Sequence, residues 1–490
     1  MILCAFAVLA VPFRRGMCYN TLINTREDTM MTHEAIDALS MPLPEDILKR
    51  KWAGDLEGAV KAIDLRLEGE LPDMLRQRLV TEKERIRRLP TQYPWNREEA
   101  IRQLQSLVPD VTEEEFDALE LAGKIDFIFL NGEKRYFVRF HRTLAKFPDM
   151  MRRMGKTVDG KSAWLDPMIE TIREKGCLRR RITLETSVYV DKAAFVPGEY
   201  RAWLPFPAPS AQQSDIRLLS GDPDEIAPED AEARTAYWHR LLAQWEKFRM
   251  TYSYVSCIRY ADPLHAPAPE RPLYPHVPEP TEADLSEEGA FIRFTPCLRA
   301  LEQSLSEGAA TPAEKAWRYY EFVTTKVKYS FMRDYFQIDH HGEYCAVNLK
   351  GDCGLQALLF INLCRIGGIP ARWQSGMSID DGYVGSHDWA QFYLPGWGWL
   401  FADPSFGGGA YRNGSASRHA FYFGNLDPMR LVANRRYQAD ITPPTAHFRV
   451  DPFDNQSGEI ERVGAPEAFT GRQVDNDATL IAVEDLPCDC

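Results

Sequence analysis

The stretch 351–370 constrains the fold of this chain more than any other. It begins Gly-Asp-Cys-Gly and continues with almost unbroken apolar residues for about three helical turns before two glycines and Pro370. An apolar run of this length predicts a buried helix, with Asp352 as its N-cap and the glycines and Pro370 as its stop. Cys353 is then the first helical residue, where free backbone N–H groups and the helix dipole favour a thiolate. We therefore expect the pKa of this thiol to lie below that of a free cysteine.

A histidine and an aspartate farther along the chain supply the other groups that a nucleophilic thiol needs. His387 opens an aromatic-rich run that predicts a strand, and Asp403 closes a second run that predicts the returning strand. If the turn consists of residues 395–397, antiparallel pairing places His387 diagonally opposite Asp403 on the same face. A two-residue turn would put them on opposite faces. The length of this turn therefore decides whether the imidazole and the carboxylate can meet.

The order of the motifs in this part of the chain resembles a known family. The four blocks are Gly351-Asp352-Cys353, Arg365-Ile366-Gly367-Gly368-Ile369-Pro370-Ala371-Arg372, His387-Asp388-Trp389 and Gly398-Trp399-Leu400-Phe401-Ala402-Asp403-Pro404. Together they resemble the signature of the transglutaminase-like superfamily, whose core is related to papain. The resemblance covers about residues 295–440 and looks most like bacterial multi-domain members. It implies an α+β fold with a transglutaminase-like core in the C-terminal half.

The resemblance also implies a cysteine-dependent enzyme that needs no metal and no organic cofactor. It implies Cys353 as the nucleophile, His387 as the general base and acid, and Asp403 as the residue that holds the imidazole. Attack of the thiol on an amide carbonyl would form a thioester, which water or an amine then resolves. The backbone N–H of Cys353 is one expected donor to the oxyanion. The second donor stays open among three upstream side chains, those of Tyr329, Gln337 and Asn348.

Two other clusters of polar residues favour ordinary structural interpretations. His340 and His341 are adjacent, and no third ligand follows at a spacing typical of zinc, so we expect a solvated pair. The charged residues at 83–88 lie between apolar positions of a predicted helix, so we expect them to form its solvated face.

Composition and charge exclude several classes of protein. With 490 residues, 44% hydrophobic and 26% charged, the chain is typical of globular proteins that contain several folding units. The net charge of −13 makes nucleic acid a poor partner and would steer cationic peptides toward the protein. Its ten cysteines are scattered without a CxxC pair, which favours neither a disulfide scaffold nor a zinc site. The apolar run 1–13 is too short to span a bilayer and lacks a preceding basic residue, so we expect a cytoplasmic protein.

Apolar periodicity separates two regions ahead of the predicted core. Apolar residues at helical spacing from Leu56 to Leu89 predict a mainly helical region, which contains a small hairpin at 125–140. From Ile182 the apolar period changes to two, which predicts an antiparallel β-rich module. The seven prolines between 263 and 280 then predict a stiff connector.

Hydrophobic periodicity is lost again near the end of the chain. After about Val463 acidic residues dominate, and we expect a frayed acidic tail that includes Cys488 and Cys490. The predicted parts are a leader of uncertain status at 1–30, a mainly helical region at 31–178, a β-rich module at 179–262, a proline-rich connector at 263–285, the catalytic core at 286–440 and a C-terminal extension with an acidic tail at 441–490.

Peptides or proteins are the substrates that the triad implies, and hydrolysis of an amide bond is the expected reaction. Water resolves a thioester by default, whereas transfer to an amine needs a dry channel, for which the sequence carries no signal. Amine transfer that cross-links glutamine side chains is an alternative that uses the same triad. A non-catalytic protein-binding module is a further alternative, against which the intact set of Cys353, His387 and Asp403 argues. Neither the natural substrate nor the oligomeric state is indicated by any motif.

Overall fold

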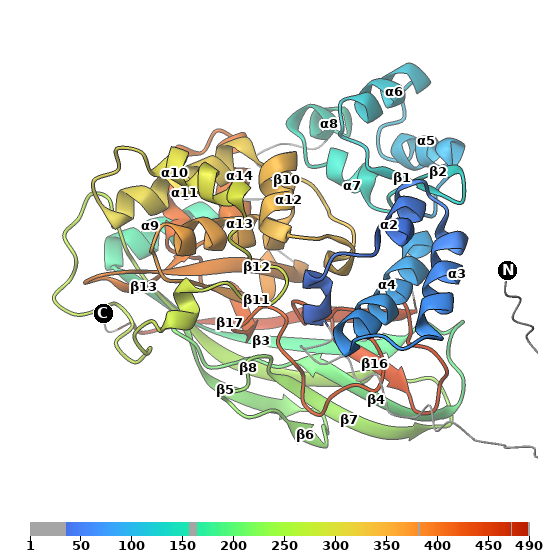
Figure 1. Cartoon of the computed structure of the whole chain (residues 1–490). Coiled ribbons are helices and arrows are strands. Elements are labelled where there is room, and N and C mark those ends of the chain that lie inside the picture. The colour runs from blue at the N-terminus through green and yellow to red at the C-terminus, as the bar shows by residue number, and fades with distance from the viewer. Residues whose placement is uncertain (1–35, 156–163, 381–382, 472, 489–490) are drawn as a thin grey trace, which may run out of the picture.

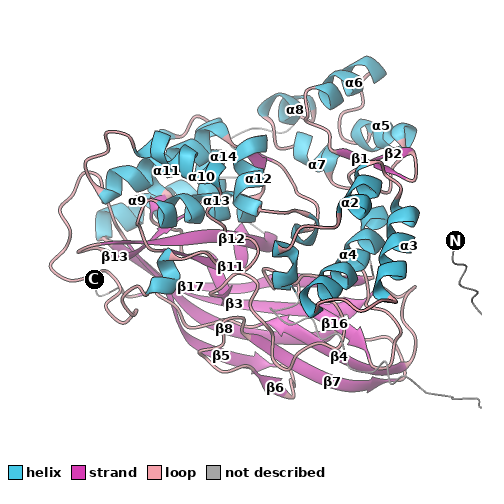
Figure 2. Ribbon diagram, in the orientation of Figure 1, coloured by secondary structure: helices cyan, strands magenta, loops and turns pink. Residues whose placement is uncertain are grey.

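The computed structural model describes residues 36–155, 164–380, 383–471 and 473–488 (Figure 1). The leader predicted at 1–30 lies outside these residues. Most helices lie on one side of the larger antiparallel sheets, as Figure 2 shows, which confirms the predicted α+β fold. Among the described residues, no helix combines the length and the apolar character needed to cross a bilayer.

The N-terminal region is mainly helical, as predicted. Its helices are α2 (Glu45–Trp52), α3 (Leu56–Leu67), α4 (Asp73–Gln92), α5 (Arg97–Gln105), α6 (Glu113–Leu121), α7 (Phe140–Leu144) and α8 (Pro148–Arg153). The predicted hairpin is confirmed as β1 (Phe127–Leu130) and β2 (Glu133–Tyr136), which pair antiparallel. A core of its own holds this unit together, with Ile63, Leu79 and Phe116 fully buried.

The charged face of α4 is buried, so the expectation of a solvated face at 83–88 is wrong for three of its residues. Glu84, Arg85 and Arg88 are buried. Arg85 Nη2 lies 2.9 Å from Asp339 Oδ1, and Arg88 Nη2 donates to the backbone carbonyl of Arg449 at 2.7 Å. These charged residues of α4 bind segments of the C-terminal half. The periodicity of a single helix does not show that another segment covers it.

The β-rich module is built from two four-stranded sheets that share the main hydrophobic core. It follows α9 (Leu165–Lys175), and its strands are β3 (Cys177–Val190), β4 (Gly198–Pro205), β5 (Gln213–Ser220), β6 (Glu225–Ile226), β7 (Thr235–Leu242) and β8 (Phe248–Arg259). Two strands from the end of the chain, β16 (Glu459–Arg462) and β17 (Val474–Leu486), complete the sheets, whose strand orders are β17-β3-β8-β5 and β16-β4-β7-β6. All of these strands pair antiparallel, as expected for the module.

The described residues after Val463 are not a frayed tail, which corrects that expectation up to residue 488; Cys490 lies outside the described residues. This end of the chain supplies β16 and the long strand β17, which pairs with β3 along its whole length (Figure 1). Val474, Ala478 and Leu480 of β17 pack against the main core, whereas most of its other side chains are exposed. The alternation is confined to 474–480 and is interrupted by the polar Asn476, so the apolar period did not identify this strand.

A disulfide joins Cys177, at the start of β3, to Cys488, just beyond β17. The two cysteines are 311 residues apart, so their spacing carried no signal of the pairing. Disulfides are typical of oxidising compartments, so this pair does not favour the cytoplasmic location, which stays a prediction.

The region 263–280 contains no helix or strand, in agreement with the predicted connector, and a short 3₁₀ turn (Glu282–Leu285) follows it. The helices of the next unit are α10 (Pro296–Ser306), α11 (Pro312–Lys326), α12 (His341–Asn348), α13 (Cys353–Ile366), α14 (Pro404–Arg412) and α15 (Ala416–Phe421). Its strands are β9 (Lys328–Tyr329), β10 (Lys350–Gly351), β11 (Ala371–Asp380), β12 (Tyr383–Leu394), β13 (Gly398–Ala402), β14 (Phe423–Gly424) and β15 (Arg430–Asn434). Five of them form one antiparallel sheet in the order β14-β13-β12-β11-β15.

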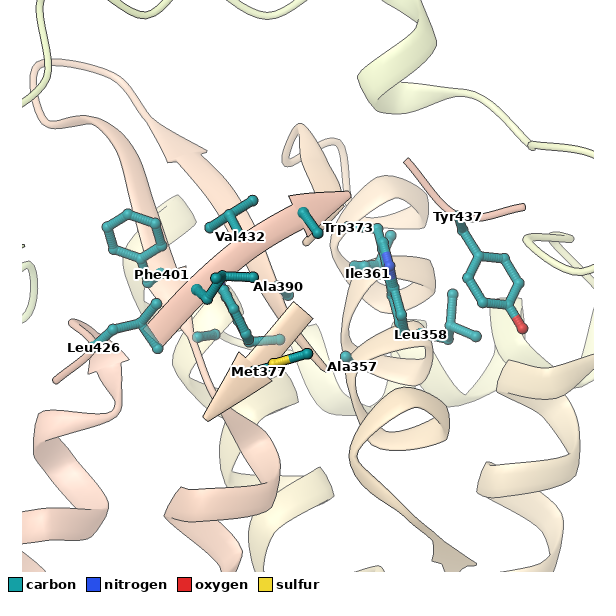
Figure 3. Packing of buried hydrophobic residues seen from close by; sticks show 14 of the residues in the cluster. Ala357, Leu358, Ile361, Trp373, Met377, Ala390, Phe401, Leu426, Val432 and Tyr437 are labelled. Carbon is teal, nitrogen blue, oxygen red and sulfur yellow. The ribbon is translucent and has the colours of Figure 1, made fainter. Parts of the chain in front are cut away.

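The helix α13 packs on β11 and β12 of this sheet. Figure 3 shows buried side chains from both layers, among them Leu358 and Ile361 of α13 and Trp373 of β11. Nearly every residue of α13 is buried, which confirms the buried helix predicted from its apolar run. Burial of this helix fixes the position of its first residue, Cys353, against the sheet.

The buried Glu82 of α4 provides a test of how the helical region is held. Its carboxylate contacts Lys51, Arg78 and Arg85. Burial opposes its ionisation, but the charges of these three cations lower the pKa of Glu82 from 4.5 to about 2. Its contribution to stability is therefore complete above pH 4.5 and is lost as the pH falls toward 2.

We predict that Glu82→Gln lowers the free energy of unfolding at pH 7 by about 3–5 kcal/mol, because buried cations lose their counter-ion. Glu98→Gln, which removes an exposed partner of Arg102, should cost less than about 1 kcal/mol. Urea unfolding followed by circular dichroism measures both values. Equal losses in the two variants would contradict the role given to Glu82.

Candidate active site

Cys353 lies at the first position of α13, where the sequence predicted it. The N-cap is Asp352, whose carboxylate accepts a hydrogen bond from the backbone N–H of Leu355 at 3.4 Å. Tyr335 also donates its hydroxyl to Asp352 at 2.6 Å and packs so closely on Gly354 that a Cβ there would lie 2.2 Å from the phenol oxygen. Glycine after the cysteine is therefore a requirement of this packing, since no side chain fits.

His387 and Asp403 meet as the turn length predicted. Leu394 pairs with Gly398, so the turn consists of residues 395–397 and places the histidine and the aspartate on the same face. His387 Nε2 lies 2.7 Å from Asp403 Oδ2, and both side chains are buried. This hydrogen bond requires a proton on Nε2, which leaves Nδ1 of the neutral ring with a lone pair.

Asp403 is held as a carboxylate by its surroundings. Its Oδ1 accepts the backbone N–H of Phe406 at 2.9 Å, so the residue also caps α14. Arg430 Nη1 lies 2.9 Å from Asp403 Oδ2. Burial opposes ionisation, but the charges of His387 and Arg430 lower the pKa of Asp403 below its usual value. The carboxylate is thus kept charged to orient the imidazole.

Arg430 is a buried partner of Asp403 that the sequence analysis missed. It is completely buried at the start of β15, forms a second ion pair with Asp427 at 2.6 Å and stacks 4.1 Å from the ring of Phe406. The one signal in the sequence is an arginine directly before the apolar run 431–433. A buried arginine in such a run needs a carboxylate partner, but the run does not tell which one.

The thiol of Cys353 contacts Asp388, not His387. Cys353 Sγ donates a hydrogen bond to Asp388 Oδ2 at 3.2 Å, and within the described ranges no hydrogen bond joins the thiol to the histidine. Gln456 donates its side-chain amide to Asp388 Oδ1 and, at 3.0 Å, to the backbone carbonyl of His387. Asp388 is thus a residue of the site that the sequence analysis did not assign.

The electrostatics of Cys353 also differ from the prediction. Burial raises the pKa of the Cys353 thiol well above its usual value, and the negative charges of Asp388 and Asp352 raise it further. The expected lowering by the helix N-terminus is therefore wrong for this resting arrangement. The prediction considered α13 alone, whereas β12 brings a carboxyl against the sulfur.

The three candidates for the second oxyanion donor differ in availability. Gln337 donates its amide to the backbone carbonyl of Arg85 at 2.7 Å, and Asn348 donates to that of Tyr344 within α12. Tyr329 lies on β9, which pairs with β10 directly ahead of Cys353. Burial raises the pKa of the Tyr329 phenol, and Cys353 is its strongest electrostatic neighbour. Tyr329 is therefore the candidate that lies beside the thiol.

The expected solvated pair at His340 and His341 is wrong for His341. This ring is fully buried, and its nitrogens contact the Tyr335 carbonyl and the Tyr437 hydroxyl, each at 2.8 Å. Burial lowers the pKa of His341 to about 3, so the ring is neutral. The described part of the chain contains no group of three or more His, Cys, Asp or Glu side chains arranged to hold a metal ion.

Comparison with known proteins identifies the class of this domain. Residues 299–404 match the transglutaminase-like superfamily, so this part of the chain is a transglutaminase-like domain, as the sequence motifs indicated. The match ends just after Asp403 and includes Cys353 and His387. No curated protein matches the chain.

Solved structures of similar proteins are distant. A candidate cysteine protease from Cytophaga hutchinsonii is 14% identical over 64% of this chain and 92% of its own, with a TM-score of 0.35. The periplasmic domain of TgpA from Pseudomonas aeruginosa is 16% identical over 51% of this chain and 95% of its own, with a TM-score of 0.26.

The contact between Cys353 and Asp388 generates a prediction about thiol reactivity. Burial raises the pKa of Asp388 well above its usual value. Asp388→Asn removes a titratable carboxyl that bonds the thiol, with little change of shape, so the pKa of the thiol should fall. Alkylation of Cys353 by iodoacetamide at neutral pH should then accelerate roughly tenfold. Mass spectrometry of the peptide that contains Cys353 measures the rate, with Asp475→Asn, at an exposed position of β17, as the control. An unchanged or slower rate in Asp388→Asn would show that the carboxyl does not restrain the thiol.

Proposed function

We propose that this chain is a cysteine-dependent hydrolase of amide bonds in peptides or proteins, with Cys353, His387 and Asp403 as its triad. The observation that carries the proposal is the 2.7 Å contact between His387 and Asp403, made on the strand whose next residue binds the thiol. An imidazole oriented by a buried carboxylate beside a cysteine is the arrangement that thiol acyl transfer requires.

The chemistry begins with the thiol leaving Asp388. For Nδ1 of His387 to accept the thiol proton, the sulfur and the imidazole must both move, because His387 and Asp388 point to opposite faces of β12. The thiolate then attacks the carbonyl carbon of the amide, and the carbonyl oxygen becomes an oxyanion. The backbone N–H of Cys353 and the hydroxyl of Tyr329 are the proposed donors to this oxyanion.

Collapse of the tetrahedral intermediate breaks the C–N bond, and the imidazolium of His387 gives its proton to the departing amine. A thioester remains on Cys353. His387 next takes a proton from water, whose oxygen attacks the thioester and releases the carboxylic acid, and the sulfur regains its proton from the imidazolium. Asp403 and Arg430 keep the imidazole oriented through both halves of the reaction.

Loss of activity in triad variants is the first prediction of this mechanism. Cys353→Ala and His387→Ala should each lower kcat by about a thousandfold or more, and Asp403→Asn should cost less than either because Asp403 only orients the imidazole. The assay is mass spectrometry of products from a peptide library. Cys297→Ala, which changes an exposed free cysteine of α10, is the control and should keep full activity. Full activity in Cys353→Ala would contradict the assignment of the nucleophile.

The acceptor of the acyl group separates hydrolysis from amine transfer. With a glutamine-containing protein, a labelled primary amine and H₂¹⁸O supplied together, we expect ¹⁸O in the carboxylate product and almost no incorporated amine. Amine incorporation that depends on Cys353 and rises with amine concentration would instead favour the transferase. Binding of peptides without any product that depends on Cys353 would favour the non-catalytic module.

A further inference from the structure

Positive side chains gather next to Tyr329, on the side where the helical region meets the transglutaminase-like domain. The backbone N–H of Phe331 donates to Thr143 Oγ1 at 3.0 Å, which ties α7 to the chain just after β9. Arg139 and Lys146 lie four residues before and three after Thr143, a spacing that puts all three on one face of a helical turn. That face is directed at β9.

The cations of this face lie over aromatic rings. The Arg139 guanidinium carbon is 5.8 Å from the ring centre of Phe331. Lys146 Nζ is 5.7 Å from the same ring and 5.9 Å from that of Tyr329, and the two rings contact each other edge to face at 5.4 Å. These positive charges are therefore separated from the neighbourhood of Cys353 by one aromatic side chain.

A third cation lies on α14, which packs on β9, the strand that contains Tyr329. It is Arg412, the last residue of this helix. Its Nη1 lies 3.2 Å from the position that a Cβ on Gly408 would take, so the guanidinium bends back over its own helix. Burial lowers the pKa of Arg412, and the phenol of Tyr329 partly opposes this effect.

Two of these cations have no carboxylate partner. Within the described residues neither the Arg139 nor the Arg412 side chain forms a hydrogen bond or an ion pair, although the protein carries a net charge of −13. Arg412 is half-buried, and a guanidinium withdrawn from water without a counter-ion is costly. Arg430, which is also buried, has two carboxylates. Arg139 is exposed and thus accessible to a ligand. A half-buried arginine without an ion pair, next to an accessible one, is the feature expected of a site that binds an anion.

We propose that Arg139 and Arg412 form a carboxylate-binding subsite beside Tyr329 and Cys353. It rests on the proposed function, and it selects peptides that carry an acidic side chain or a terminal carboxylate next to the reacting amide. The net charge of the whole chain predicts the opposite, a preference for cationic peptides. At contact distance the positive charges of Arg139 and Arg412 outweigh the net negative charge of the chain, because distant surface charges are screened beyond about 10 Å.

Two alkylating reagents of different charge test the subsite without any turnover. Iodoacetate carries a carboxylate and iodoacetamide does not, so the ratio of their rates at Cys353 reports the charge of the approach. The variants are Arg139→Gln and Arg412→Gln, with Arg142→Gln as a control that removes an exposed cation from the same helix. The same set is measured in the Asp388→Asn background, in which the thiol is expected to react faster.

We expect the ratio of the iodoacetate rate to the iodoacetamide rate to fall about two- to threefold in each of Arg139→Gln and Arg412→Gln. It should stay unchanged in Arg142→Gln, and thermal melting checks that every variant is folded. A ratio that stays at the wild-type value in both Arg139→Gln and Arg412→Gln would overturn the subsite.

Peptide pairs that differ only in Glu or Gln beside the amide separate the two proposals. We expect kcat/KM to favour the Glu peptide by about tenfold in the wild type and to lose this preference in Arg139→Gln/Arg412→Gln. A changed alkylation ratio without hydrolysis of any peptide would support the subsite and reject the hydrolase. Hydrolysis without a Glu preference, together with an unchanged alkylation ratio, would reject the subsite and leave the hydrolase intact.

Discussion

The antiparallel register of β12 and β13 is the constraint on which the site depends. Pairing of Leu394 with Gly398 sets the turn length, and the alternation of side chains then brings His387 to Asp403. A shift by one residue would move the imidazole to the other face and leave a buried aspartate with Arg430 alone. The buried ion pair and the cap on α14 both depend on the same carboxylate, so register, helix start and imidazole orientation support one another.

The alternation within β12 also explains the resting position of the thiol. Successive residues of a strand point to opposite faces, so a strand that presents His387 to Asp403 presents Asp388 to the layer of α13. Cys353 therefore finds a carboxyl in its resting position, with Gln456 holding the other oxygen of that carboxyl. A thiol with a raised pKa is protected from oxidation, and its activation by His387 requires the thiol and the imidazole to move toward each other.

Local features of this chain were predictable because each depends on a few neighbouring residues. The cap at Asp352, the buried α13 and the turn at 395–397 follow from residue types and period, and the structure confirms all three. The features that were missed depend on contacts between distant segments. Arg430 meets Asp403 only in the folded sheet, and β17 is recognisable only by its pairing with β3. The burial of the charged residues of α4 was likewise missed. Charged residues on a helix predict a solvent-exposed face, and only the folded structure shows which segment covers that face.

The most direct measurement is a crystal structure of the protein with a peptide aldehyde bound covalently at Cys353. An aldehyde forms a thiohemiacetal that resembles the tetrahedral intermediate. The account predicts a carbon–sulfur bond at Cys353, the sulfur turned away from Asp388 to within ~4 Å of His387 Nδ1, and the oxygen of the adduct directed at Tyr329. An adduct whose sulfur remains against Asp388, with the imidazole out of reach, would contradict the central claim that His387 activates this thiol.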